Sequence, residues 1–550
     1  MNQASKKFFK KGDPYVLLTS LGLLISLGMV LWLLAIVLVK GLGIFWPREL
    51  VQINSKDENV YLGELWNSGK EISENEFEQI VEEEKTQLKI GNRDLYGYDF
   101  IWISDKEIIT MTKPQNAAVF ERSEYGNLYG FILQVNLNNE IVTDSSELFN
   151  EAEKGISLAH ELKIKLDEIE EEYNTLLTPL NKIQREISLL KVNSDFLTDE
   201  EAKRLNLLKE EENKLTESIN QPRIVLEEKI STLKERLNSF TVNVITANGD
   251  ETLMQLKNVV RLYQPNEMGI FGKSIHYVQN LWEFLSGEPR ESNTEGGVFP
   301  AIFGTVMMVI LMSILVVPFG VLAAVYLNEY AKQGALTRII RLSVNNLAGV
   351  PSIVFGIFGL GFFIYIVGGS IDQFFFSDKL PTPTFGTGGI LWASLTLALL
   401  TLPVVVVATE EGILAVPKAN KDGALALGAT KWQMIKKVVL PNAMPGILTG
   451  LILAISRGAG EVAPLMITGV VKLAPDMPLD FNFPFFHLDR KFMHLGFHIY
   501  DVGFQSPNVE AAIPMVYSTA LLLIAIVVFL NLLAIYLRNR LRKKYKSSSF

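Results

Sequence analysis

The sequence contains no cysteine and only five histidines in 550 residues. Without cysteine, both a disulfide-stapled scaffold and a thiolate metal site are excluded. No nucleophile stands at a characteristic spacing from a base, and no nucleic-acid-binding motif is present. We therefore expect a chain that is not an enzyme by itself, with no catalytic residue, no metal site, no cofactor and no nucleic-acid partner.

The histidines near the C-terminus offer one alternative. His494 and His498 have the i,i+4 spacing of a helix, and Asp489 and Asp501 lie nearby in the sequence. A metal ion needs further ligands at a convincing spacing, and the sequence does not supply them. We expect this stretch to be a solvated loop outside the membrane.

Hydrophobic residues make up 48% of the chain, and its formal net charge is -9. The negative charge is unevenly placed, because acidic residues dominate residues 51–297 whereas basic residues dominate the remainder. This division predicts an acidic soluble block and a basic, membrane-embedded remainder.

Six apolar runs approach the ~20 residues that one crossing of a bilayer requires. Five carry no charge: Tyr15–Val39, Val298–Leu327, Val350–Gly368, Gly389–Ala408 and Ala511–Leu537. The sixth, about Ala443–Val471, contains Arg457 and Glu461. We expect an all-α polytopic membrane core with six transmembrane helices.

Basic residues flank these spans on one side of the membrane. They precede the first span, follow the last, and recur in the loops 328–349 and 409–442; those at the two ends include Lys6, Lys7, Lys10, Lys11, Arg538, Arg540 and Arg542. Positive charge marks cytoplasmic loops, so both termini should be cytoplasmic and residues 40–297 should lie outside. The first span is too long for a signal-peptide core and should be an uncleaved anchor.

The outer block has the pattern of a small α+β domain in two pieces. Tyr98–Ile109, Tyr129–Leu137 and Phe240–Ile245 are rich in residues that favour strands, and Asn248-Gly249 predicts a hairpin turn after the last of them.

A heptad pattern separates these two pieces. The a positions are Ala159, Leu166, Tyr173, Leu180 and Ile187, and the d positions are Leu162, Ile169, Leu176, Ile183 and Leu190. With a turn at residues 193–195 and a capping box starting at Thr198, this predicts an antiparallel coiled-coil hairpin over about 151–239. Pro179 should bend the first helix, and Pro222 should kink or break the second. The hairpin is either a spacer or a docking arm for a partner.

Arg457 and Glu461 lie in the least hydrophobic span. A charge near the bilayer midplane costs on the order of 3 kcal/mol, so the pair should face a bundle interior or a water path. One interpretation is an i,i+4 ion pair that only neutralises two buried charges. The other is a substrate pathway, in which the planar guanidinium of Arg457 contacts an oxyanion in transit and Glu461 holds it when the path is empty.

Small residues recur every four positions along the same span: Gly446, Gly450, Ala454 and Gly458. Such a stripe lets a neighbouring helix approach closely, so we expect helix packing there. Arg457 falls on the same arc of the helix.

The segment Asp422–Pro441 combines a glycine turn with basic and apolar residues, which predicts a short helix pair at the membrane surface. Its order of Asp422, Gly423 and Ala424, then Gly428, then Val438-x-Leu440-Pro441 resembles the cytoplasmic loop of ABC importer permeases. That family usually has Glu-Ala-Ala, Gly and Ile-x-Leu-Pro. The resemblance implies ATPase coupling through Asp422, Gly423, Ala424, Gly428, Leu440 and Pro441, within the loop 409–442.

Three further stretches resemble phosphate-specific permeases of the PstA type within that family. Ser456–Leu465 is similar to the family signature Arg-x-x-Gly-Glu-Thr-Ala-Pro-Leu, with Val462 in place of Thr; Asn345–Gly356 and Pro289–Ile302 are the others. The resemblance implies a permease subunit for ATP-driven phosphate import in a bacterial inner membrane. It also implies a second permease subunit, two ATPase subunits that hydrolyse the ATP, an extracytoplasmic phosphate-binding protein and contact with membrane lipid.

The expected organisation follows from these patterns. Residues 1–46 form the N-terminus and first span, 47–280 an extracytoplasmic insert, 281–537 a core with five spans, and 538–550 a basic cytoplasmic tail. Two alternatives stay open: a permease for another oxyanion such as sulfate or molybdate, and a membrane-anchored coiled-coil adaptor or sensor, which needs only one or two spans.

Overall fold

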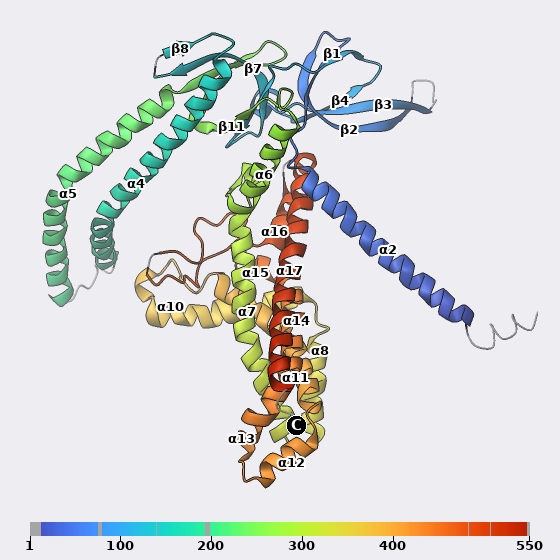
Figure 1. Cartoon of the computed structure of the whole chain (residues 1–550). Coiled ribbons are helices and arrows are strands. Elements are labelled where there is room, and N and C mark those ends of the chain that lie inside the picture. Colours follow the sequence, from blue (N-terminus) through green and yellow to red (C-terminus); the bar gives the residue numbers. More distant parts are fainter. Residues whose placement is uncertain are drawn as a thin grey trace, which may run out of the picture. The chain divides into compact units, whose positions relative to one another are not determined.

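The computed structural model describes residues 13–74, 80–138, 140–192, 199–481, 483–506 and 508–546. The chain divides into two compact units (Figure 1): a membrane unit, up to Phe45 and from Asn280 onward, and an insert unit, Trp46–Gln279. The lysines before the first span, and the turn predicted at 193–195 with its cap at Thr198, lie outside the described residues.

Six helical runs among the described residues are long and apolar enough to cross a membrane. They are Tyr15–Gly43, Phe299–Tyr330, Ser352–Phe375, Ile390–Leu414, Lys431–Gly460 and Val509–Arg540. The predicted number of spans is therefore confirmed.

The elements of the membrane unit are mostly helices. They are α2 (Asp13–Gly43), β12 (Pro289–Arg290), β13 (Glu295–Gly296), α7 (Phe299–Val325), α8 (Ala335–Leu347), α9 (Ser352–Phe358), α10 (Gly369–Phe375), α11 (Ile390–Leu414), α12 (Lys418–Ala426), α13 (Lys431–Met434), α14 (Leu440–Gly460), α15 (Ala463–Thr468), α16 (Leu495–Tyr500) and α17 (Val509–Lys546). π-Helical turns continue several of these helices, at Tyr326–Tyr330, Gly359–Gly368, Ile435–Val439 and Asp501–Gln505. The core lies where α7, α11 and α14 meet, around Met308, Leu397 and Ala454.

The predicted span Ala443–Val471 is wrong at both ends. α13, the π-helical turn and α14 form one run from Lys431 to Gly460, after which the backbone is extended at Glu461. α15 then begins with Pro464 in its first turn. A straight helix would press the Pro464 ring against the carbonyl of Gly460, so the proline favours a break here, although α14 itself continues through Pro445.

The insert unit contains two antiparallel sheets. Its strands are β1 (Leu50–Ser55), β2 (Val60–Glu74), β3 (Ile80–Lys89), β4 (Phe100–Ser104), β5 (Ile108–Thr112), β6 (Ala118–Arg122), β7 (Leu128–Leu137), β8 (Glu140–Val142), β9 (Thr241–Ile245), β10 (Glu251–Gln255) and β11 (Val259–Tyr263). The first sheet has the order β4-β3-β2-β1-β5, and the second has the order β10-β9-β7-β6-β11 with β8 on β7.

The second sheet joins strands from both sides of the hairpin, because β7 pairs with β9. β9 and β10 are connected through Gly249, whose φ of 90° is left-handed, and Ile245 pairs with Glu251 across the turn. The turn predicted at Asn248-Gly249 is thus confirmed. The insert unit also contains a short helix, α3 (Arg93–Tyr96), and the first part of α6 (Ile270–Ser286), which continues past Gln279 into the membrane unit.

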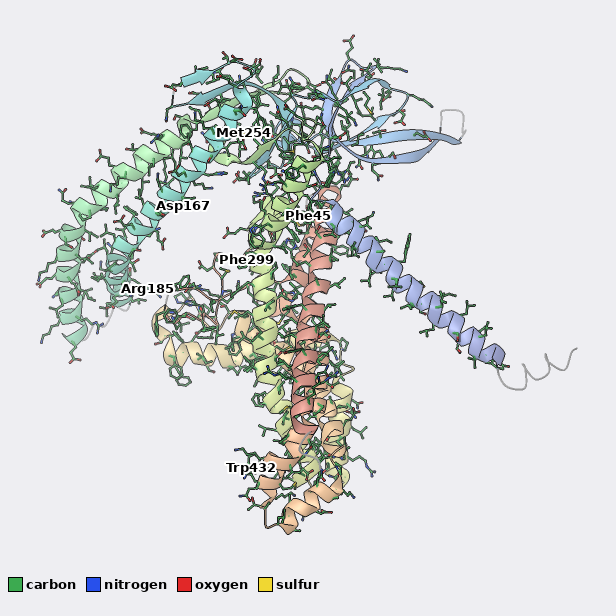
Figure 2. All side chains as sticks on the ribbon, viewed as in Figure 1. Phe45, Asp167, Arg185, Met254, Phe299 and Trp432 are labelled. Atoms are coloured by element: carbon green, nitrogen blue, oxygen red, sulfur yellow. The ribbon has the colours of Figure 1, made fainter. Side chains whose placement is uncertain are left out.

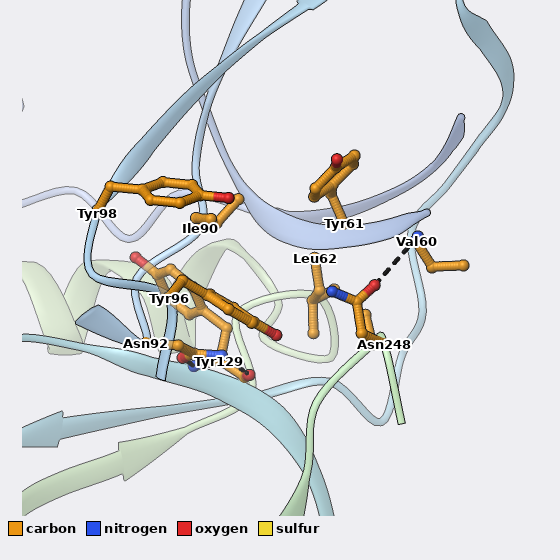
Figure 3. Close-up of a pocket in the computed structure, with 10 residues that line it drawn as sticks. Val60, Tyr61, Leu62, Ile90, Asn92, Tyr96, Tyr98, Tyr129 and Asn248 are labelled. Carbon is orange, nitrogen blue, oxygen red and sulfur yellow. Dashed lines mark hydrogen bonds between the residues drawn. The ribbon is translucent and has the colours of Figure 1, made fainter. Parts of the chain in front are cut away.

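A narrow cleft marks the seam between the two sheets (Figure 3). Tyr61, Tyr96, Tyr98 and Tyr129 line it together with Asn92 and Asn248. The hydroxyl of the buried Tyr129 donates to Glu64 Oε1 at 2.8 Å, which ties β7 of one sheet to β2 of the other.

α4 (Leu148–Val192) and α5 (Asp199–Ser239) form the predicted hairpin. Every predicted a and d side chain is buried or half-buried. Contacts between the helices run in opposite directions along the chain, such as Tyr173 with Glu227 and Gln184 with Glu212, so the pair is antiparallel. α5 continues through Pro222, so the predicted break is absent, although both helices curve in Figure 1.

The base of the hairpin belongs to the core of the second sheet. Ala152, Ile156 and Ala159 pack with Phe240 and Leu256 in one buried cluster, and Met254, labelled in Figure 2, is part of it. The imidazole Nε2 of His160 lies 3.0 Å from the carbonyl oxygen of Val259. The segment 151–239 is therefore not a self-contained appendage; only its outer part is free of the sheet.

Candidate functional site

The segment Asp422–Pro441, here called the coupling segment, runs from within α12 through α13 and its π-helical turn into the start of α14. α12 ends in a Schellman turn: the amide of Ala429 donates to Ala424 and that of Gly428 to Leu425. Gly428 has a φ of 85°, which is why glycine suits this position. Thr430 and Gln433 then form a reciprocal capping box that starts α13.

The two halves of the coupling segment differ in burial. None of the nine described residues of α12 is buried. By contrast Met434, Ile435 and Val439 pack into a cluster with Ala324 and Leu327 from the end of α7. Leu427 is 91% exposed and Trp432, labelled in Figure 2, is 54% exposed. The segment thus presents apolar side chains on an anchored base.

The prediction that the surface helix pair ends at Leu440 and Pro441 is wrong. They begin α14, with the proline in the first turn, and follow the π-helical turn without interruption. The predicted loop 409–442 is also shorter at its other end, because α11 continues to Leu414. Glu410 is tolerated there because its carboxylate accepts a hydrogen bond from Arg341 of α8 at 3.2 Å.

Two glycines of the α14 stripe lie against α11, and a third lies against α7. A Cβ on Gly446 would lie 2.6 Å from Gly412 Cα, and one on Gly450 would lie 2.9 Å from Ala408 Cβ. A Cβ on Gly458 would lie 2.6 Å from the sulfur of Met312. Ala454, between them, is fully buried. These contacts leave no room for larger side chains.

Arg457 and Glu461 lie at the end of α14. Arg457 Nε and Glu461 Oε1 are 3.7 Å apart, and the side chains are 30% and 21% exposed. Glu461 is the residue that caps the helix, so the i,i+4 ion pair considered as one of the two interpretations spans the helix end. It is only partly buried among the described residues.

Two of the stretches that resemble phosphate permeases, Asn345–Gly356 and Ser456–Leu465, lie against each other beside this break. A Cβ on Gly356 would lie 2.8 Å from Pro464 Cα, and one on Gly359 would lie 2.3 Å from Thr396 Oγ1 and 3.0 Å from Thr468 Cγ2. Gly356 therefore lets α9 pack against α15, and Gly359 lets the turn after α9 pack against α11 and α15.

The third motif, Pro289–Ile302, begins as the small β12–β13 hairpin and continues into α7. Asn293 donates to the carbonyl of Lys472 at 3.0 Å, and Lys472 pairs with Asp501 at 3.2 Å. A hollow of about 580 Å³ opens beside it, walled by Glu288, Pro300, Asp480 and Met493 among others. Arg490 bonds to Asp480 at 2.6 Å, which fixes one wall.

The expectation that His494 and His498 lie in a solvated loop is wrong, because both are buried. Burial lowers the pKa of His494 to about 3. Burial likewise lowers the pKa of His498 to about 4, against the opposing charge of Asp501. His494 Nδ1 accepts from the Gly496 amide at 3.1 Å, so its proton sits on Nε2. Within the described ranges no group of three or more metal-ligating side chains forms.

Sequence reasoning missed two features of this region. Gly412 faces Gly446, and its own Cβ would lie 2.9 Å from the Ala443 carbonyl oxygen; its isolated position after Glu410 and Glu411 gave no periodic signal. Glu329, at the end of the second span, pairs with Lys421 at 2.6 Å. An acidic residue at the end of a span, beside a loop rich in lysine and arginine, was the available signal.

Residues 316–546 match the family model described as binding-protein-dependent transport system inner membrane component. A probable ABC transporter permease of Bacillus subtilis, YqgI, is 31% identical over 271 residues, covering 48% of this chain and 86% of that protein. The chain belongs to this family of ABC importer permeases. It is accordingly a multi-pass inner-membrane permease component that does not itself hydrolyse ATP.

Other proteins are similar over shorter stretches. The phosphate transport system permease protein PstA 1 of Mycobacterium tuberculosis is 36% identical over 243 residues, covering 44% of this chain and 71% of that protein. PstA of Yersinia pestis is 34% identical over 188 residues, covering 34% and 57%. Among solved structures, an inward-facing MetNI methionine ABC transporter is 19% identical, with a TM-score of 0.32 and coverage of 48% and 96%.

Proposed function

We propose that this permease carries inorganic phosphate as a membrane subunit of an ATP-driven importer. The observation that carries the proposal is Arg457 beside Glu461 at a helix break, within a stretch similar to the phosphate-permease signature. Relatives named as phosphate transport permeases, 34% and 36% identical, support the choice of substrate.

The geometry of the pair suits transient binding. At 3.7 Å the two groups attract each other without a hydrogen bond, so the guanidinium keeps donors that fit the oxygens of phosphate. Glu461 competes with the anion for Arg457. This competition keeps binding weak enough for release, as conduction requires. A sulfate or molybdate ion would meet the same donors, so these oxyanions are the rival substrates.

The coupling segment is the proposed docking site of the ATPase. Asp422, Gly423 and Ala424 lie on the unburied α12, the left-handed turn at Gly428 exposes Leu427, and Leu440 and Pro441 pass directly into α14. Exposed apolar side chains on a firm base are typical of a protein contact. Movement of the segment would thus reach the helix that carries Arg457.

The remaining partners follow from the same function. A second permease subunit completes the path, two ATPase subunits supply the energy, an extracytoplasmic binding protein delivers phosphate, and lipid surrounds the spans. Both termini and the coupling segment would face the cytoplasm, and residues 47–280 would form an extracytoplasmic insert. In this arrangement the hairpin is a spacer or a docking arm.

Uptake of labelled phosphate by cells carrying Arg457→Ala, Glu461→Ala and the double variant tests the substrate role. Each single variant leaves one charge without its partner, so each should lower the membrane level of the protein. The double variant should recover that level but not transport, and Arg457→Lys should transport poorly because an ammonium lacks the planar fork. Near-normal uptake per molecule by the double variant would leave the pair only a structural role.

A further inference from the structure

Glu329 connects the second span to both short helices of the coupling segment. It lies in the π-helical turn Tyr326–Tyr330 that continues α7. Its Oε1 accepts a hydrogen bond from Lys421 of α12 at 2.6 Å. Its main-chain oxygen accepts a second from Lys431 of α13, whose ammonium also lies 4.8 Å from the centroid of the Tyr330 ring. One residue thus holds both helices.

This contact matters because the other packing of α12 is limited to one small side chain, the half-buried Ala424, which lies against the cluster that contains Met434 and Ile435. Its nine described residues include none that is buried, and a Cβ on Gly423 or Gly428 would meet nothing within 4 Å. The Lys421 and Glu329 side chains are only 19% and 11% exposed. A shielded pair is screened less by salt than a surface pair and holds its geometry better.

Arg341 extends the connection to two more helices. From α8 it donates to the carbonyl of Leu327 at 3.2 Å and to Asn328 at 3.1 Å, both in or beside the same turn, and to Glu410 of α11 at 3.2 Å. The turn is therefore where α7, α8, α11, α12 and α13 are joined by polar contacts.

We propose that the Glu329–Lys421 ion pair is the positioning contact that transmits movement of the coupling segment to the second span. This inference rests on the proposed docking of the ATPase on that segment. When α12 is displaced, the short pair carries the end of α7 with it. Without the pair, the ATPase still docks and hydrolyses ATP, but α12 tilts without moving the span.

The test uses the complete complex, purified with its ATPase subunits and reconstituted in vesicles with the binding protein and phosphate. Glu329→Gln and Lys421→Met each remove one charge while keeping side-chain length. Each should retain the ATPase and hydrolyse ATP, while phosphate carried per ATP falls about three- to tenfold. The double variant should be no worse than the poorer single variant, because both changes remove the same contact.

Lys332→Met is the matched control, since it removes an exposed lysine next to the same turn and should leave the ratio unchanged. Lys421→Arg keeps the charge and should restore most of the coupling. A normal ratio in both single variants, additive losses in the double variant, or loss of the ATPase from the complex would each overturn the proposal. Failure of the proposed function is separable, because it appears in the unaltered complex as absence of ATP-driven phosphate uptake.

Discussion

The hairpin α4–α5 meets along leucine and isoleucine side chains, whereas α11 and α14 meet along glycine. In the hairpin, Leu162, Leu166 and Ile187 fill the seam and charged residues cover the outside. In the membrane unit, Gly446 and Gly412 bring two backbones into contact. Both pairs are antiparallel, but the hairpin contact is filled by large aliphatic side chains, whereas glycines without side chains form the contact between α11 and α14.

The difference reflects the two environments that the sequence predicts: water around the hairpin and lipid around the membrane helices. Water drives large apolar side chains together, so a coiled coil gains by burying as much apolar area as possible. Lipid is as apolar as leucine, so a membrane helix gains little from burial and depends on close packing and polar contacts. One pair should therefore fail when a side chain is removed, and the other when a side chain is added.

Adding a side chain at the α11–α14 contact should have the largest effect. In Gly446→Leu the new Cβ would lie 2.6 Å from Gly412 Cα and 3.0 Å from the carbonyl oxygen of Ala408, neither of which is a flexible side chain. Overpacking of this kind costs about 1–3 kcal/mol or more. The folded protein extracted from membranes should fall steeply, as judged by its recovery as a monodisperse peak in gel filtration.

Gly361→Leu provides the control for that experiment. It adds the same side chain within a span, at a glycine with nothing within 4 Å of a Cβ. Its recovery should match the unaltered protein. Equal recovery of the Gly446 and Gly361 variants would show that close approach of α11 and α14 is not what holds the membrane unit together.

Removing a side chain from the hairpin should have an effect confined to the hairpin, so recovery of the folded membrane unit should fall less than in Gly446→Leu. Leu166→Ala deletes a buried seam residue and should cost about 2–5 kcal/mol, whereas Ile164→Ala removes a side chain that is 60% exposed. Hydrogen–deuterium exchange should accelerate in α4 and α5 for the first variant only. Similar exchange in the two variants would contradict the heptad seam.

Acid should destabilise the membrane unit more than the hairpin. His494 and His498 have pKa values lowered to about 3 and about 4 by burial, so the unfolded chain binds more protons below the ordinary histidine pKa. The stabilisation by the neutral histidines is fully present above about pH 6.5. As the pH is lowered below this value, the free energy of unfolding decreases, by about 2 kcal/mol per histidine at pH 5. The midpoint of thermal unfolding should fall between pH 7.5 and 5, and less so in His498→Gln. Identical pH dependence in that variant would argue against a buried neutral imidazole.

Shortening the hairpin should have the smallest effect on transport. Tyr173 and Glu227 face each other at 2.8 Å, so residues 174–226 can be replaced by a short glycine-rich turn without disturbing the sheet core. If the outer hairpin is a spacer, phosphate uptake per molecule should be unchanged. Lost uptake at a normal membrane level would identify it as a docking arm instead.

The sequence predicted what depends on periodicity and failed where a single residue overrides it. The spans and the heptad seam follow extended sequence patterns, and the Asn248-Gly249 turn follows a two-residue signal. All three are present in the structure. The end of α14 was misplaced because hydropathy continues past Glu461, whereas the helix ends at Gly460, four residues before Pro464. Pro222 was predicted to kink or break the second helix; the break is absent, because α5 continues through the proline as one helix.

Long-range polar contacts were beyond prediction for a different reason. The pairing of Glu329 with Lys421 joins residues far apart in the chain, and no local pattern encodes it. The burial of His494 and His498 likewise depends on neighbours from distant segments, such as Thr305, which binds the Leu495 amide at 2.9 Å, and Thr519. Arg457 and Glu461 were found because a charge inside a hydrophobic run is conspicuous.

The central claim, phosphate import, is tested most directly by transport into vesicles that contain the complete complex. Labelled phosphate should accumulate only when ATP and the phosphate-loaded binding protein are supplied, and an excess of sulfate or molybdate should not reduce the rate. Accumulation of labelled sulfate or molybdate in place of phosphate would contradict the assignment and leave an ABC importer permease for a different oxyanion.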